Sequence, residues 1–391
     1  MKRYSETIKL EKLVPGGQAL GLLPSDKKVF VWGGLPGETI EAEIFKSKST
    51  YAEATTTKVL ESSPNRIVQQ DECYLSTSPW QIMDYDYELS QKSNLIQESF
   101  AQQGIELGQP VRIVTDGRKY EYRNKMEYSL WWDNDTRKIS LAFHKRGTHQ
   151  KIPIEKSSIE RPEILDCAKQ MVTELNARSE QARKYQLLLA RCSQDGKVSA
   201  ELFENSKPHP RMTTLEDKLL GHNYSYSPNG FFQINLPVYE MALNAIKGFI
   251  ETDDILDLYA GVGTIGLSVA RDRNLTLVET NPNAFNELER NLPDGTNSIT
   301  AIHAKSEDVL DYIKNDGTVI VDPPRAGLDS KIIDKLKTTK PPVVIYLSCN
   351  PITQARDIAP LLDSYNIKHV CGYNFFPRTP HIENLVVLEK S

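Results

Sequence analysis

The stretch "DLYAGVGTIG", Asp257 to Gly266, decides the fold of this chain. It ends an apolar segment and carries glycines at 261, 263 and 266, a formal G-x-G-x-x-G pattern. Such glycines let the backbone turn sharply and approach a ligand at the N-terminus of the following helix. The stretch therefore predicts the first strand, ligand-binding turn and helix of an open α/β sheet.

The residues around this stretch alternate between apolar strands and amphipathic helices. Segments that are apolar throughout are typical of parallel strands buried on both faces, and the helices between them make the crossovers. We therefore expect a Rossmann-like, doubly wound parallel sheet over 231–391. The expected strands are 255–259, 275–279, 318–322 and 343–348, and the expected helices are 237–250, 264–272, 284–292, 309–314 and 331–337.

Several polar residues stand where these strands end. Because ligands of open α/β sheets bind beyond the carboxyl ends of the strands, we expect Asp257, Glu279, Asp322 and Cys349 at one rim. Glu279 is well placed to accept hydrogen bonds from a ribose diol. A dinucleotide fold and an S-adenosylmethionine fold share this pattern, so an NAD-dependent oxidoreductase stays open. Asp257 would face the diphosphate of NAD, whereas it suits a cofactor with a sulfonium and an ammonium group, so the methyl donor is favoured.

The rest of the chain divides into two further parts. Residues 1–60 read as short strands separated by turns, which predicts a small closed barrel of the oligonucleotide-binding type, or an SH3-like adaptor. Residues 61–230 begin with a linker, SSPNR, and mix helices with strands, so they form a central α+β domain. The predicted domains are therefore 1–60, 61–230 and 231–391.

Bulk composition narrows the class of protein. The chain has 391 residues, which implies two or three domains, and a net charge of −5. A mid-chain basic stretch that includes Arg118, Arg123, Lys125 and Arg146 could touch phosphates in spite of that net charge. The five cysteines form no CxxC pair, which fits a reducing cytoplasm, and we expect no signal peptide and no membrane span.

Five stretches in order resemble the RNA uracil-5-methyltransferases, class I S-adenosylmethionine-dependent enzymes that make 5-methyluridine. These stretches are "GFFQIN" (230–235), "DLYAGVGTIGL" (257–267), "VDPPRAGL" (321–328), "YLSCNPITQARDI" (346–358) and "FFPRTPHIENLVVLEK" (375–390). Two further segments are similar as well: "KVFVWGGLPGE" (28–38) to the TRAM domain of the family, and "YRNKMEYSL" (122–130) to its central domain.

The resemblance implies a role for each site residue. Uracil C5 is a poor nucleophile, and a thiolate that adds at C6 turns C5 into an enolate carbon. Cys349 is the expected thiol, and Glu383 is the expected base that removes the C5 proton. The residues expected to bind the donor are Gln233, Tyr259, Gly261, Gly263, Glu279 and Asp322.

The resemblance also implies the partner and the setting. A TRAM barrel favours ribosomal RNA, 23S rRNA above all, over transfer RNA as the substrate. We expect a cytoplasmic monomer with a flipped target uridine. A non-catalytic RNA-binding factor that has kept the fold is the remaining alternative, and the joint presence of Cys349, Glu383, Gln233 and Asp322 argues against it.

One departure from the family concerns its iron–sulfur cluster. Many relatives hold a four-iron cluster through four cysteines, three of them just after the barrel. Here "DECYLSTSPW" (71–80) offers Cys73 alone, and "IPIEKSSIE" (152–160) offers serines where the fourth ligand would fall. One thiolate does not hold a cluster, so we expect no iron–sulfur cluster and no metal. Packing by Trp80 and Tyr85 is expected to replace it.

Overall fold

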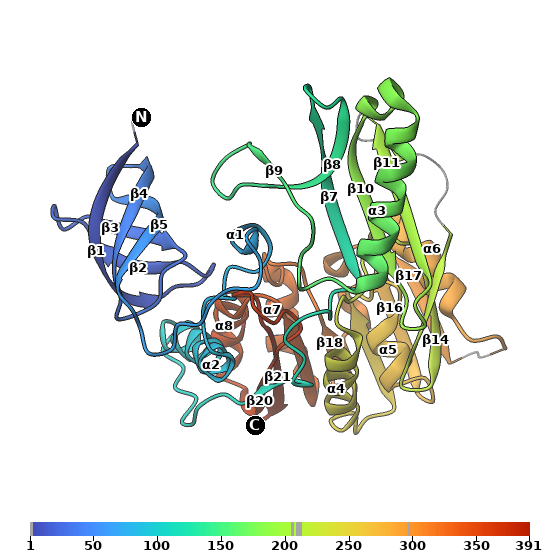
Figure 1. Cartoon of the computed structure of the whole chain (residues 1–391). Coiled ribbons are helices and arrows are strands. Elements are labelled where there is room, and N and C mark those ends of the chain that lie inside the picture. The colour runs from blue at the N-terminus through green and yellow to red at the C-terminus, as the bar shows by residue number, and fades with distance from the viewer. Residues whose placement is uncertain (1–2, 205–206, 209–212, 296–297) are drawn as a thin grey trace.

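The computed structural model describes residues 3–204, 207–208, 213–295 and 298–391, and it begins with a closed five-stranded barrel (Figure 1). Alternate residues of each strand, such as Ile8, Leu10, Val29 and Val31, fill its interior. The expected closed barrel is thus confirmed. Its strands, hydrogen-bonded in the order β1-β2-β3-β5-β4, are β1 Tyr4–Leu13, β2 Ala19–Leu22, β3 Lys28–Trp32, β4 Thr39–Ser47 and β5 Tyr51–Glu61.

Two helices follow the barrel, α1 (Tyr74–Thr77) and α2 (Tyr85–Ala101). Asp84 caps α2, since its carboxylate accepts hydrogen bonds from the next amides. Ile96 and Phe100 on α2 pack into the core of the C-terminal sheet rather than against the central strands. The helix therefore joins the barrel to the region that carries the site.

A six-stranded antiparallel sheet stands above the C-terminal sheet in Figure 1, with α3 (Pro162–Ala177) packed on one face. Helix α3 ends at Ala177, and a short 3-10 helix, Ser179–Lys184, separates it from strand β10 (Tyr185–Cys192). A separate hairpin, β13 (Leu215–Leu219) with β14 (His222–Tyr226), follows. The strands of the six-stranded sheet are β12 Lys207–Pro208, β11 Val198–Glu204, β10 Tyr185–Cys192, β7 Lys125–Asp133, β8 Lys138–His144 and β9 Lys151–Pro153.

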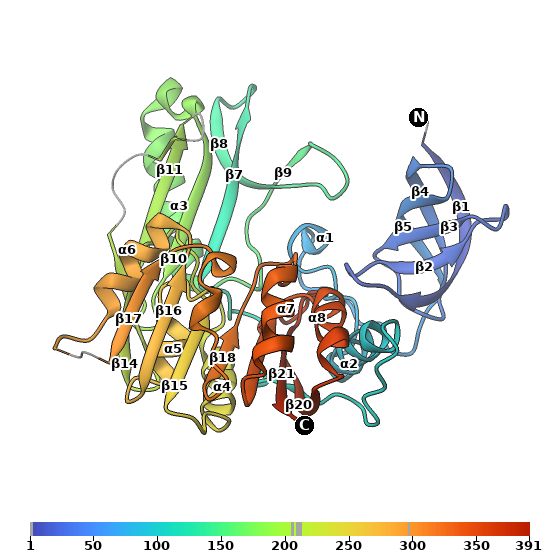
Figure 2. The ribbon, with the colours of Figure 1, turned by 180° about the vertical axis from the view of Figure 1, so that it is seen from behind.

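The C-terminal part is an eight-stranded sheet with helices on both faces (Figure 2). Its first five strands pair in parallel, as the alternation predicts. In sheet order the strands are β17 Ile299–His303, β16 Asn274–Glu279, β15 Asp254–Leu258, β18 Thr318–Val321, β19 Val343–Ser348, β21 Glu383–Lys390, β20 Tyr365–Tyr373 and β6 Ile113–Val114.

The two faces of this sheet have separate cores. Helices α4 (Leu236–Lys247), α5 (Thr264–Val269) and α6 (Pro282–Asn291) pack on one face, together with the β13–β14 hairpin. Helices α2, α7 (Ser330–Thr339) and α8 (Pro351–Ile358) cover the other face. The sheet is therefore doubly wound, and the Rossmann-like fold class is confirmed.

Two details differ from the expectation. Residues 309–314, expected as a helix, form only 3-10 turns, because the segment is too short to bury one face. The last strand, β21, runs antiparallel to β19, with Asn384 opposite Ser348. The start of β21 therefore lies beside the end of β19, which brings Glu383 to the edge of the sheet that carries Cys349. Among the described residues, no helix is long and apolar enough to cross a membrane.

Candidate active site

The largest cavity described here, of about 1030 Å³, opens at the carboxyl ends of the parallel strands. We call it the rim cavity. Of the nine residues predicted at this site, seven line the cavity, namely Gln233, Tyr259, Gly261, Glu279, Asp322, Cys349 and Glu383. Segments far apart in the sequence thus meet at one place.

The glycine turn is fixed by the carboxylate that ends β16. Glu279 Oε2 accepts a hydrogen bond from the Gly261 amide at 2.8 Å, and its Oε1 accepts one from the Asn281 amide at 2.6 Å. Tyr259 and Gly261 both have positive φ values, 66° and 59°, in the left-handed region. The turn therefore holds a conformation that one of its residues, Tyr259, adopts only at a cost in strain.

Gly263 is one predicted site residue that does not line the rim cavity. Its φ is +87°, and a Cβ there would lie 2.5 Å from Leu288 Cδ1. Glycine is needed here for a left-handed turn and for close packing of α6 behind the turn. A side chain at position 263 would therefore point into the protein core and not into the cavity.

Asp257 also differs from the expectation that it stands at the rim. Its side chain is fully buried in β15, and Oδ2 accepts a hydrogen bond from the Gly266 amide at 2.8 Å. It does not line the rim cavity, so the expectation for Asp257 is wrong. Burial raises the pKa of its carboxyl to about 8, against some stabilisation by the Gly266 amide. Asp257 therefore supports the glycine turn from below.

The thiol of Cys349 stands where β19 gives way to α8. The Ser348 hydroxyl accepts a hydrogen bond from the Asn350 amide at 3.1 Å. Asn350 caps α8 by accepting from the Ile352 amide, and its Nδ2 donates to the carbonyl of Arg325 at 2.9 Å. The Ser-Cys-Asn turn is therefore tied to the Asp-Pro-Pro-Arg turn, which orients both into the rim cavity.

Burial and, after it, acidic neighbours disfavour the thiolate form of Cys349. Burial raises the pKa of its thiol to about 11, and the charges of Glu383 and Asp322 add to this rise, while Arg325 opposes it. Burial likewise raises the pKa of Asp322 to about 7 and that of Glu383 well above its usual range. Asp322 raises the pKa of Glu383 further, and Arg325 lowers it. A cation in the cavity would relieve this excess of negative charge.

The loop that presents Gln233 is held by a buried arginine of the central sheet. Arg191 is fully buried, and it donates to the carbonyls of Gly230, Phe232 and Gln233 at 3.2, 2.5 and 3.2 Å. Asn124 adds a hydrogen bond to the Gln233 carbonyl at 3.1 Å. The central sheet therefore sets the position of the Gln233 loop.

The loop between β20 and β21 is held from the side of α2. Lys92 is fully buried and donates to Asn374 Oδ1 at 2.6 Å and to the Phe376 carbonyl at 3.0 Å. Glu88 accepts from the Arg378 amide at 3.0 Å. These contacts fix the segment that leads into Glu383.

Among the lining residues that the sequence did not reveal are Arg325, Phe376 and His381. Arg325 Nη2 lies 3.2 Å from His381 Nδ1, and burial and the Arg325 charge lower the His381 pKa to about 4. His381 is therefore neutral and accepts from Arg325. All three lie within the stretches "DPPRAGL" and "FFPRTPHIEN", but residue type alone gave no signal of their role.

Residues 71–80 and 152–160, where relatives are expected to hold a four-iron cluster, do not fit such a group. Cys73 is buried, and its Sγ lies 3.7 Å from the Lys156 carbonyl. Asp71 accepts hydrogen bonds from the Ser158 amide and hydroxyl and from Gln81. Among the described residues, no group of three or more His, Cys, Asp and Glu side chains is placed to hold a metal ion.

A polar network, rather than aromatic packing alone, joins the two halves of this segment. Trp80 packs in the barrel core and donates to the Gly17 carbonyl at 3.1 Å, while the Tyr85 hydroxyl bonds Thr115 at 2.7 Å. Neither ring bridges the segments that carry Cys73 and Ser158. The contacts of Asp71 provide that bridge, so the expected role of Trp80 and Tyr85 is corrected.

Comparison with known proteins bears on this arrangement. A family model described as tRNA (Uracil-5-)-methyltransferase matches residues 305–391, and a TRAM domain model matches residues 3–57. The predicted resemblance to the RNA uracil-5-methyltransferases is confirmed. The predicted enzyme class, a methyltransferase, and the predicted donor, S-adenosyl-L-methionine, are confirmed with it.

Full-length relatives agree. A protein of Enterococcus faecalis described as an RNA methyltransferase is 26% identical, and the match covers 100% of both chains. One of Mycoplasma mobile with the same description is 28% identical over 93% of both chains. The crystal structure of Pyrococcus abyssi tRNA (uracil-54, C5)-methyltransferase with S-adenosyl-L-homocysteine matches with a TM-score of 0.78 and 24% identity, covering 98% of this chain and 100% of that one. This last likeness shows the shared fold.

Proposed function

We propose that the chain transfers a methyl group to C5 of a uridine in RNA, with Cys349 as nucleophile and Glu383 as base. The observation that carries the proposal is that Cys349 and Glu383, from antiparallel neighbours β19 and β21, line one cavity together with the glycine turn. Addition at C6 requires a thiol, and proton removal at C5 requires a carboxylate that lines the same cavity.

The residues act in sequence on the pyrimidine. The Cys349 sulfur forms a bond to C6, and the electron pair of the C5–C6 double bond makes C5 nucleophilic. S-adenosylmethionine would supply the methyl group, because its S–CH3 bond breaks as the C5–CH3 bond forms and neutral S-adenosylhomocysteine is the leaving group. The Glu383 carboxylate then takes the C5 proton, the double bond re-forms, and the thiolate leaves C6. The S–C6 bond is thus broken again, and Cys349 is regenerated as a thiolate while Glu383 holds the proton that left C5.

The lining of the rim cavity suits a positively charged donor. Burial raises the pKa values of Asp322 and Glu383, and Asp322 adds to the rise at Glu383, while Arg325 offsets it only in part. Gln233, Tyr259, Gly261 and Glu279 would hold the donor beside Cys349. The acidic lining also disfavours a diphosphate, which argues against the NAD-dependent alternative.

Two RNA classes are candidates for the substrate. The barrel matched by the TRAM model supports ribosomal RNA, with 23S rRNA as the proposed target. The description of the family model and the named substrate of the Pyrococcus abyssi relative favour transfer RNA as the second candidate. The target uridine must leave its stack, because sulfur and methyl donor act on the two faces of one ring.

The proposal is tested by methyl transfer from labelled S-adenosylmethionine to 23S rRNA and tRNA isolated from a strain that lacks this protein. We expect label in 5-methyluridine of one class of RNA. Absence of 5-methyluridine from both, or equal transfer by the Cys349→Ala variant, would refute the proposed chemistry. Binding of NADH without binding of S-adenosylmethionine would support the oxidoreductase instead.

A further inference from the structure

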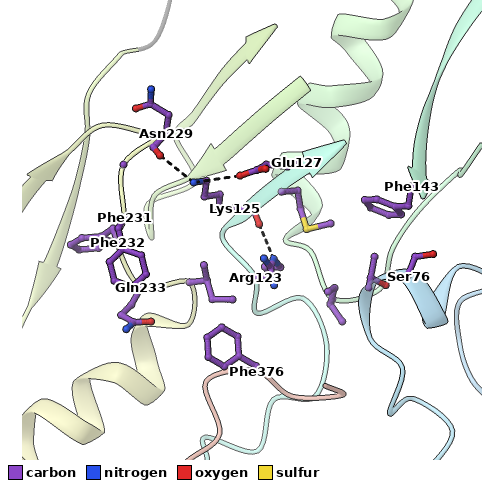
Figure 3. Close-up of a pocket in the computed structure, with 15 residues that line it drawn as sticks. Ser76, Arg123, Lys125, Glu127, Phe143, Asn229, Phe231, Phe232, Gln233 and Phe376 are labelled. Atoms are coloured by element: carbon purple, nitrogen blue, oxygen red, sulfur yellow. Dashed lines mark hydrogen bonds and ion pairs between the residues drawn. The ribbon is translucent and has the colours of Figure 1, made fainter. Parts of the chain in front are cut away.

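A second cavity, of about 610 Å³, adjoins the rim cavity (Figure 3). We call it the side groove. It shares one wall with the rim cavity, residues 229–233 and Phe376, and its other wall belongs to the central sheet and α1. Its volume lies in the range of about 300–1,000 Å³ that holds small organic ligands.

We propose that the side groove binds a nucleotide next to the target uridine in the same RNA strand. The proposal rests on the RNA methylation proposed above and names how that RNA is held. Because both cavities share a wall, a strand whose uridine enters the rim cavity places a neighbouring nucleotide at the side groove.

Charge is the first argument. Lys125, the first residue of β7, and Arg123, just before that strand, line the groove, as Figure 3 shows. Arg123 Nε donates to the Lys125 carbonyl at 2.9 Å, and within the described residues its terminal guanidinium nitrogens make no hydrogen bond. A guanidinium held at one end with free donors at the other suits a phosphate oxygen. The groove thus offers cationic donors where the rim cavity offers mainly carboxylates.

Aromatic surface is the second argument. Phe231 stands on the shared wall with 72% of its surface exposed. Phe376 lines both cavities, and Lys92 fixes its backbone through the carbonyl. The exposed Phe231 ring, the partly buried Phe376 ring and the Arg123 guanidinium together form a combination that stacks unpaired bases and neutralises their phosphates.

One acidic residue reduces the positive charge of the side groove. Glu127 lines it, and its Oε1 lies 3.7 Å from Lys125 Nζ. Lys125 also donates to the Asn229 carbonyl at 3.3 Å, so Arg123 is the less occupied cation. The Glu127 carboxylate repels a bound phosphate, and its removal should strengthen RNA binding. This gives the proposal a test that a folding defect does not imitate.

The test uses a fluorescein-labelled, single-stranded RNA dodecamer with one uridine, bound to the full chain in the presence of S-adenosyl-L-homocysteine. For Arg123→Met we expect about tenfold weaker binding by fluorescence anisotropy and a salt slope smaller by about 0.7, the value for one phosphate contact on a single strand. For Glu127→Gln we expect about threefold tighter binding.

Matched controls change the same charges elsewhere. Arg273→Met removes an arginine that pairs with Asp253 and lines neither cavity, and Glu216→Gln changes an exposed residue of β13. Both should bind the dodecamer like the wild type. Equal binding by Arg123→Met and Arg273→Met, or no gain for Glu127→Gln over Glu216→Gln, overturns the proposal.

An abasic scan locates the occupant. Removing the base at one position beside the uridine should weaken wild-type binding about tenfold, as loss of one stacked base does. Equal effects at every position of the dodecamer would overturn the neighbouring-nucleotide assignment. Methyl transfer is measured in parallel. If the variants bind RNA as predicted but no methyl group is transferred, the proposed reaction is refuted and the nucleotide site in the side groove stands. If methyl transfer occurs but the variants bind RNA like the wild type, only the proposed nucleotide site is refuted.

Discussion

The rim cavity and the side groove share a wall but differ in charge. Among charged residues, the rim cavity has four acids, Glu279, Glu287, Asp322 and Glu383, against Arg290 and Arg325. The side groove has Arg123 and Lys125 against Glu127 alone. A site that must hold a cationic donor and a polyanionic strand side by side needs this division. The net charge of −5 therefore says little about the partner, because the local distribution decides which ligand each cavity attracts.

The largest expected effect is a loss of methyl transfer in the rim cavity with no change in RNA binding at the side groove. Cys349→Ala should lower methyl transfer by more than about 10⁴-fold, because the nucleophile is removed. Binding of the dodecamer should stay within about twofold of wild type, because the groove is unchanged. Labelled methyl transfer and anisotropy on the same preparation check both statements. Joint loss of both would mean that the two cavities are not separable.

The second effect separates the base from the nucleophile. Glu383→Gln should lower turnover by about 10²–10⁴-fold, since the C5 proton has no acceptor. Its RNA adduct should accumulate, because sulfur leaves C6 only after that proton is lost. Denaturing gel electrophoresis with labelled RNA detects the adduct. Fast turnover without an adduct would assign the base role elsewhere.

The third effect concerns the loop that lies between the two cavities. Arg191→Met leaves the Gly230 and Phe232 carbonyls without this donor, while Asn124 still donates to the Gln233 carbonyl. Each unsatisfied carbonyl costs on the order of 1–3 kcal/mol, so the unfolding free energy should fall by several kcal/mol. Thermal unfolding measures this loss. Arg273→Met is the surface control, and a melting temperature equal to that control would show that Arg191 does not hold the loop.

The fourth effect is the alkylation of Cys349. With its pKa raised to about 11, the thiol should react slowly with iodoacetamide at pH 7, and the rate should rise about tenfold per pH unit up to pH 10. Glu383→Gln removes a charge that raises this pKa, so alkylation at pH 8 should be faster. Mass spectrometry of the peptide that contains Cys349 gives the rates. A rate independent of pH would contradict the acidic surroundings inferred for the thiol.

The smallest expected effect is a dependence of the unfolding free energy on pH, caused by buried carboxyl groups such as Asp257. The folded pKa of Asp257 is raised from 3.8 to about 8, so the folded state binds more protons than the unfolded state between these values. Stability without donor should therefore fall as pH rises from 5 to 8, by at most about 1.4 kcal/mol per pH unit for this group. Asp257→Asn should flatten the slope in urea unfolding. An unchanged slope would exclude Asp257 as its source.

Much of this arrangement follows from sequence. Parallel strands that are apolar throughout predict which ends carry polar residues, and Glu279, Asp322 and Cys349 meet at that rim. Asp257 does not, because strand position alone does not tell a residue at the rim from one a layer below it. The side groove was not predictable either, since it joins residues near 125 with residues near 231. That contact depends on Arg191 and Asn124, whose hydrogen bonds to the loop carry no local signal.

The antiparallel β21 is the other feature that sequence concealed. Glu383 opens an apolar strand like several other charged residues of the chain, and only the reversed direction of β21 brings it to Cys349. Phe376 and His381 lie in the loop that leads into β21 and reach the cavity with it, whereas Arg325 lies in the loop after β18. Residue types thus predicted the chemistry in part, whereas strand direction completed the site.

Covalent trapping is the most direct measurement of the central claim. The full chain is incubated with S-adenosylmethionine and with 23S rRNA and tRNA transcripts that contain 5-fluorouridine, whose C5 fluorine does not leave as a proton. We predict a denaturation-stable complex in which mass spectrometry finds one fluoromethyl-uridine joined to the sulfur of Cys349. A stable complex through another residue, or methylation of ordinary RNA with no trapped complex, would contradict the account.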